Sequence, residues 1–278
     1  MRQEHARSVS FVPVEGIRRS VTGADGIRIG LLTAGSGPDL LLVHGGMGSI
    51  DSWHMVWDTL TAQRRVTAMD RRGRGSSGDA SSYALDSEYA DVKAVAGALA
   101  SDQGGPVDVA GHSIGGTCVL GAAALGAPFR RIVLYEPPGP QTVRDDWPER
   151  LAAMVADGRV GRAVFTFLTE LIGLTPAEVE VLRDTPGGRD VLPVAAATLP
   201  REARALTIAD LAGAARKVSQ PAGLLLGTDS PPWASEITRE LAAALPAATV
   251  IQLPGTGHEG LEQAPEKVAA EMLRFLNG

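Results

Sequence analysis

Short, continuously apolar runs alternate along the chain with longer runs whose apolar residues recur every three or four positions. Runs of the first kind are typical of parallel strands buried on both faces, and runs of the second kind are typical of helices packed on such a sheet. The predicted strands are residues 27–32, 39–43, 65–69, 107–110, 131–135, 222–226 and 249–253. The predicted helices beside them are residues 87–100, 114–125, 235–245 and 265–276.

The pattern changes in the middle of the chain, where helical runs punctuated by Pro and Gly replace the strands. These predicted helices are residues 147–156, 159–171, 176–182, 188–197 and 201–211. Strand–helix alternation with right-handed crossovers predicts an α/β fold with a doubly wound, mostly parallel sheet. Because the strand pattern then resumes, we expect one core formed by residues 1–136 and 214–278, with a helical cap inserted at residues 137–213.

The segment Gly111-His112-Ser113-Ile114-Gly115 lies between a predicted strand and a predicted helix. A G-x-S-x-G sequence in this setting is typical of a nucleophile elbow, a tight turn that raises a serine hydroxyl above the sheet edge. Glycines two residues before and after the serine avoid Cβ clashes between strand and helix. Ser113 is therefore the predicted nucleophile.

A serine hydroxyl needs a base, and the base needs a carboxylate that fixes its tautomer. His258 follows the last predicted strand, at the carboxyl edge of the sheet where α/β active sites form. Asp229 follows the strand at residues 222–226 and is the expected acid. Glu136, at the end of the strand at residues 131–135, is the alternative acid, because it also lies at this edge.

Acyl chemistry also needs N–H donors for a tetrahedral oxyanion. The glycine-rich segment after the strand at residues 39–43 can turn its backbone N–H groups into the site. We expect the oxyanion hole to combine the N–H of Gly46, or that of Met47, with the N–H of Ile114.

Together these segments resemble the α/β-hydrolase superfamily, a group of serine hydrolases that often carry a helical cap. The matching segments are His44-Gly45-Gly46, Asp70-Arg71-Arg72-Gly73-Arg74-Gly75-Ser76-Ser77, Gly111-His112-Ser113-Ile114-Gly115-Gly116 and Gly257-His258. The resemblance implies that residues 137–213 shape the substrate pocket. One departure concerns the acid, because many members place it three residues after the glycine that ends its strand, where this chain has Ser230.

The predicted function is hydrolysis of a carboxylic ester, lactone or thioester through an acyl-serine. Members resembling cofactor-free haloperoxidases form peracids with the same residues, and others are C–C hydrolases or lyases. A non-catalytic ligand-binding protein on this scaffold is a further alternative. We do not expect a dehalogenase or an epoxide hydrolase, because those relatives need a carboxylate nucleophile at the elbow.

Composition limits the kinds of partner and cofactor that we expect for this protein. The formal charge of −6 gives no concentrated basic surface for nucleic acid. Neither a signal-peptide pattern nor an apolar run long enough to span a bilayer occurs, which predicts a cytoplasmic protein without a membrane partner. The single cysteine, Cys118, excludes a cysteine-rich metal site. No metal or organic cofactor is implied, and the expected ligand is a small molecule with an apolar part.

Overall fold

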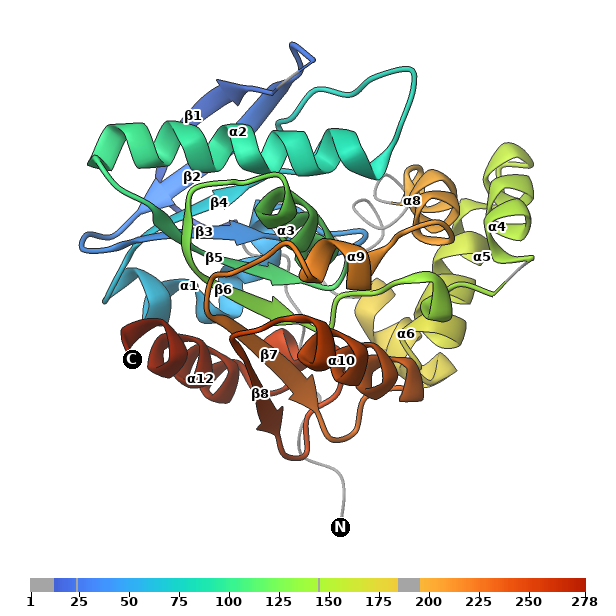
Figure 1. Cartoon of the computed structure of the whole chain (residues 1–278). Coiled ribbons are helices and arrows are strands. Elements are labelled where there is room, and N and C mark those ends of the chain that lie inside the picture. The colour runs from blue at the N-terminus through green and yellow to red at the C-terminus, as the bar shows by residue number, and fades with distance from the viewer. Residues whose placement is uncertain (1–12, 24, 145, 185–195) are drawn as a thin grey trace.

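The computed structural model describes residues 13–23, 25–144, 146–184 and 196–278. Eight strands form one sheet in the order β1-β2-β4-β3-β5-β6-β7-β8 (Figure 1). β2 pairs antiparallel with β1 and β4, whereas the pairs from β4 through β3, β5, β6 and β7 to β8 are all parallel. The strands are β1 (Ile17–Thr22), β2 (Arg28–Ala34), β3 (Asp39–Val43), β4 (Arg65–Met69), β5 (Val107–His112), β6 (Phe129–Tyr135), β7 (Ala222–Gly227) and β8 (Ala248–Leu253).

The predicted α/β fold with a mostly parallel sheet is confirmed, and every predicted strand is present with small shifts at its ends. β1 was not predicted. Most of its side chains are exposed, so it lacks the continuous apolar run of a buried strand. It completes an antiparallel hairpin with β2 at the edge of the sheet.

Helices cover both faces of the sheet, and each face has its own apolar core. One core contains residues of α2 (Leu85–Gln103), α3 (Ile114–Ala124) and α10 (Pro232–Ala244). The other contains residues of α1 (His54–Thr61) and α12 (Pro265–Asn277). The central strands are consequently shielded from water on both sides, which explains their continuously apolar sequences.

Further helices lie between β6 and β7, as the sequence predicts. They are α4 (Trp147–Ala156), α5 (Val160–Thr166), the π-helix η3 (Phe167–Leu171), α6 (Pro176–Asp184), α8 (Leu199–Leu206) and α9 (Leu211–Ala215). The predicted helix at 188–197 falls largely outside the described residues. Figure 1 shows α4, α5, α6 and α8 beyond the end of the sheet to which the parallel strands point. The carboxyl ends of these strands therefore face the inserted helices.

Backbone packs closely against backbone where β5 turns into α3. A Cβ built on Gly115 would stand 2.2 Å from the Val43 carbonyl oxygen, and one on Gly111 would stand 2.6 Å from the Gly115 carbonyl oxygen. Both distances are shorter than any real Cβ contact, so only glycine allows α3 to approach β3 and β5 this closely.

We predict that Gly115→Ala destabilises the protein by about 3 kcal/mol, because the methyl group overlaps backbone atoms that cannot move away. Gly97→Ala is the matched control, since Gly97 lies within α2 and a Cβ there meets nothing within 4 Å. It should stabilise the helix by about 0.5–1 kcal/mol. Urea denaturation of both variants measures the two changes, and equal stability of the two variants would contradict this account.

Candidate active site

Ser113 lies at the junction of β5 and α3 in a conformation that non-glycine residues rarely adopt, with φ 52° and ψ −133°. Its N–H donates to the Tyr135 carbonyl oxygen at 2.9 Å, which ties the turn to the neighbouring strand β6. A non-glycine residue at positive φ costs of order 1–3 kcal/mol and persists only where the surrounding structure fixes it. The backbone at Ser113 thus has the strained turn that the sequence predicts for the elbow.

His258 is buried and its Nδ1 lies 2.7 Å from Glu136 Oε2. The other carboxylate oxygen, Oε1, accepts from the Gly227 N–H at 2.8 Å and from Ser230 Oγ at 2.6 Å. Because a carboxylate accepts, His258 Nδ1 carries the hydrogen and Nε2 is left as the ring's basic nitrogen. Burial lowers the pKa of His258, but the hydrogen bond and charge of Glu136 outweigh burial and raise that pKa above its usual 6.5.

The carboxylate on His258 therefore belongs to Glu136, the alternative acid, and not to Asp229. Asp229 is exposed, and its Oδ1 accepts from the Thr228 hydroxyl at 3.0 Å. Its backbone N–H donates to the Thr256 carbonyl oxygen, so the residue serves the turn after β7. The position one residue later holds Ser230, whose hydroxyl supports Glu136.

The side chains of His112 and Trp233 lie beside the His258 ring. The His112 ring lies 4.9 Å from the His258 ring, and its Nε2 donates to the His258 carbonyl oxygen at 2.9 Å. Burial, together with the nearby His258, lowers the pKa of His112 to about 3, so His112 stays neutral. The edge-on ring of Trp233 lies 5.1 Å from His258, and its Nε1 donates to the Leu171 carbonyl oxygen of η3.

The glycine loop after β3 lies directly against the elbow. A Cβ on Gly45 would stand 3.1 Å from Ser113 Cβ. The Arg71 N–H donates to His44 Nε2, so His44 Nδ1 carries the hydrogen that it donates to the Gly45 carbonyl oxygen at 2.9 Å. That oxygen also accepts from Arg71 Nη1 and from the Gly48 N–H, each at 3.3 Å.

These bonds fix the peptide that joins Gly45 to Gly46. In a trans peptide the C=O and N–H groups point in opposite directions, so the Gly46 N–H points away from the donors that hold the Gly45 carbonyl. Within the described residues, the N–H groups of Gly46, Met47 and Ile114 donate no hydrogen bond. All three expected oxyanion donors are thus available to a ligand.

Backbone strain is concentrated at these same positions. Among the described residues, the non-glycine residues with positive φ are Met47 (60°), Ser113 (52°) and Glu136 (45°). Each directly follows, or lies shortly after, the carboxyl end of a parallel strand: β3, β5 and β6. Strain that gathers at one sheet edge favours a functional rather than a purely structural role for that edge.

Comparison with known proteins agrees with this geometry. The model of the alpha/beta hydrolase family matches residues 40–271. The chain belongs to this family. An alpha/beta hydrolase from Sphaerobacter thermophilus DSM 20745 has a solved structure that superimposes with a TM-score of 0.80 and 31% identity, covering 93% of this chain and 100% of that one.

Two curated relatives of this hydrolase carry enzyme names. Pimeloyl-[acyl-carrier protein] methyl ester esterase of Nitrosomonas europaea is 28% identical over 248 residues, which cover 84% of this chain and 94% of the relative. Protein phosphatase methylesterase 1 of Mus musculus is 36% identical over 125 residues, but these cover only 44% of this chain and 31% of the relative.

Behind the glycine loop, the hydrolase contains a buried charge cluster that the sequence analysis did not identify. Arg71 Nη2 lies 2.7 Å from Glu88 Oε1 of α2 and 3.3 Å from Glu202 Oε1 of α8. Arg74 Nη2 lies 3.0 Å from the same Glu202 oxygen. The arginines of the segment after β4 are therefore buried ion-pair partners that connect the core, the glycine loop and an inserted helix.

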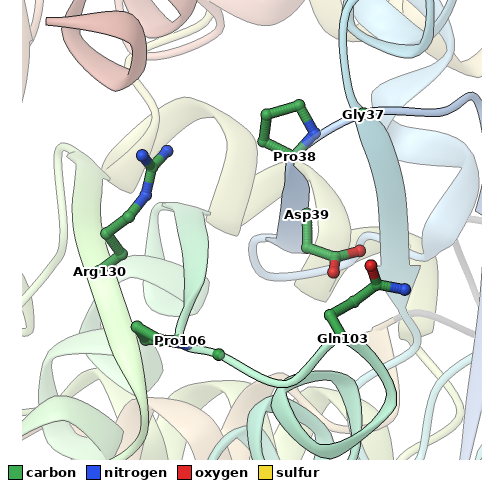
Figure 2. A pocket seen from close by; sticks show the side chains of 7 residues that line it. Gly37, Pro38, Asp39, Gln103, Pro106 and Arg130 are labelled. Carbon is green, nitrogen blue, oxygen red and sulfur yellow. The ribbon is translucent and has the colours of Figure 1, made fainter.

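Other features of the hydrolase lie away from this edge. A pocket between the amino ends of the strands is lined by Asp39, Gln103 and Arg130, among others, and includes none of the candidate residues (Figure 2). No group of three or more His, Cys, Asp or Glu side chains in the described ranges is arranged to hold a metal ion. Among the described helices, none is both long and apolar enough to cross a membrane.

The hydrogen bond between Glu136 and His258 generates a prediction that needs no substrate. Glu136→Gln should lower the pKa of His258, because it removes the charge that offsets burial. Asp229→Asn is the matched control and should leave that pKa unchanged. NMR titration of the His258 ring measures both, and the opposite pattern would restore Asp229 as the acid.

Proposed function

We propose that this hydrolase is a serine esterase in which Ser113, His258 and Glu136 form the catalytic triad. The observation that carries the proposal is the buried 2.7 Å hydrogen bond between His258 and Glu136, at the sheet edge where Ser113 adopts its strained turn. This arrangement has the members of a serine triad in their usual roles, with the acid supplied by the strand β6. Residues 137–213 act in this proposal as a cap over the site.

The chemistry follows from the roles of these groups. Ser113 Oγ attacks the ester carbonyl carbon while His258 Nε2 takes its proton, and Glu136 stabilises the imidazolium through Nδ1. The carbonyl oxygen becomes an oxyanion that accepts from the N–H of Gly46 or Met47 and from that of Ile114. His258 then protonates the departing alcohol, leaving an acyl-serine. A water molecule, deprotonated by His258, attacks the acyl carbon and regenerates the Ser113 hydroxyl.

The names of the relatives favour an ester among the substrates that this machinery could accept. Two curated relatives are methyl esterases. Perhydrolysis, C–C hydrolysis, lyase chemistry and ligand binding without turnover would use the same scaffold, and nothing in this site favours them over ester hydrolysis. Beside Gly46, the ring of Phe167 lies 3.5 Å from where a Cβ would stand, which supports a substrate with an apolar part.

We predict that Ser113→Ala lowers hydrolysis of a p-nitrophenyl ester by about 10⁵–10⁶-fold, the loss expected when a serine nucleophile is removed. A fluorophosphonate should add its phosphonyl mass to the wild-type protein and not to this variant, as intact-protein mass spectrometry would show. Ser235→Ala is the control, since it removes an exposed hydroxyl of α10 that, among the described residues, bonds only to the Pro232 carbonyl oxygen and should leave the labelling intact. Labelling that persists in Ser113→Ala would place the nucleophile elsewhere.

The raised pKa of His258 predicts the pH dependence of kcat/KM. The free enzyme needs neutral His258, so kcat/KM should fall as the pH falls through a value above 6.5. Glu136→Gln should move this limb to lower pH, because it lowers the pKa, and should reduce the plateau by about 10³–10⁴-fold.

Asp229→Asn should keep both the limb and the plateau of the wild-type profile. A profile in which Asp229→Asn loses the plateau while Glu136→Gln keeps it would contradict the assignment of the acid.

A further inference from the structure

Glu202 is a buried carboxylate of the inserted helix α8 that faces the glycine loop. Its side chain is only 5% exposed, and Oε2 lies 3.7 Å from the point where a Cβ on Gly46 would stand. Phe167 and Ile114 stand at 3.5 and 3.9 Å from the same point. The carboxylate is therefore part of the wall around the proposed oxyanion donor.

The two oxygens of Glu202 have different surroundings. Oε1 accepts from Thr198 Oγ1 at 2.9 Å, from Arg74 Nη2 at 3.0 Å and from Arg71 Nη2 at 3.3 Å. Within the described parts of the chain, none of the hydrogen bonds to this carboxylate goes to Oε2. An ionised carboxylate accepts hydrogen bonds on both of its oxygens, so Oε2 keeps its acceptor capacity on the side of Gly46.

Glu202 is ionised at any working pH. Burial raises the pKa of its carboxyl, but the charges of Arg74 and Arg71 outweigh burial and lower that pKa to about 2. The cluster of Arg71, Arg74, Glu88 and Glu202 carries no net charge, so it offers a ligand an acceptor without a strong field. A neutral donor matches such a site, whereas a substrate carboxylate would meet an acceptor with nothing to donate.

We propose that Glu202 determines substrate specificity by accepting a hydrogen bond from a hydroxyl or N–H group on the acyl part of the ester. The inference rests on the proposed esterase function, since it places the ester carbonyl oxygen on the Gly46 N–H. An acyl group bound in this way lies beside Gly46, where Oε2 and the Phe167 ring flank it. The favoured acyl group is therefore short, apolar on one side and hydroxylated or amidated near the carbonyl.

Two pairs of isosteric p-nitrophenyl esters test the proposal: 3-hydroxybutanoate against 3-methylbutanoate, and 2-hydroxypropanoate against 2-methylpropanoate. Each pair exchanges a hydroxyl for a methyl group of similar size. We expect wild-type kcat/KM to favour the hydroxyl member of at least one pair by about tenfold or more, the usual effect of a hydrogen bond to a charged group.

Glu202→Gln should lower this ratio several-fold, because a hydroxyl can then make only a neutral hydrogen bond, as acceptor from the amide NH₂. Both arginines only donate, so the amide oxygen must face them and the amide NH₂ then faces Gly46, which replaces the acceptor by a donor. Glu202→Asp provides a second variant that keeps the charge but withdraws the oxygen from Gly46, and it should lower the ratio as well. Circular dichroism and thermal melting identify any variant that does not fold.

Asp79→Asn is the matched control. Asp79 accepts from Arg201 at 2.8 and 2.9 Å, so it ties the same helix α8 to the core without touching the glycine loop. This variant should keep the wild-type ratio, even if its overall rate changes. A ratio that falls equally in Asp79→Asn would show that loosening of α8, and not the lost acceptor, is responsible, and would overturn the inference.

The remaining outcomes distinguish a failure of the specificity role of Glu202 from a failure of the proposed esterase function. Ser113-dependent hydrolysis without a hydroxyl preference, or with a preference that Glu202→Gln retains, would overturn the inference and leave the esterase proposal standing. The absence of Ser113-dependent hydrolysis with every ester would overturn both.

Discussion

The Glu136 carboxylate connects three parts of the chain at one edge of the sheet, and the geometry of the site depends on it. Glu136 directly follows β6. Its carboxylate accepts hydrogen bonds from the Gly227 N–H at the end of β7, from the Ser230 hydroxyl and from His258, which follows β8. A buried carboxylate is stable only when such donors replace the water that it has lost. The same bonds that allow the charge to be buried therefore hold the His258 ring in one orientation and one tautomer.

Much of this arrangement follows from local sequence. Buried parallel strands have continuous apolar sequences, and the β5–α3 turn demands glycine at 111 and 115, so strand positions and the elbow at Ser113 could be predicted directly. For the partner carboxylate of His258, the sequence leaves two candidate residues. Asp229 and Glu136 both follow strands at the same edge, and what distinguishes them is a hydrogen bond between Glu136 and His258, which lie 122 positions apart.

The features that the sequence did not predict share this long-range character. Arg71 and Glu202 lie 131 positions apart and pair only because α8 returns to the glycine loop. A run of arginines after a strand looks like a solvated loop until its carboxylate partners are known. Backbone strain at Glu136 distinguishes it from Asp229, but no sequence rule predicts positive φ for a glutamate, since the surroundings and not the residue impose it.

The residues of the candidate active site are distributed unequally along the chain, because the proposed acid is Glu136. Ser113 and Glu136 belong to one continuous β5–α3–β6 unit, which ends where the inserted helices begin, whereas His258 lies beyond them. An exchange, extension or cut within the inserted segment would therefore leave Ser113 and Glu136 on one continuous stretch of chain. If the chain were divided there, one fragment would carry the glycine loop and two members of the proposed triad, and the other would contribute His258 and the strands β7 and β8 that precede it.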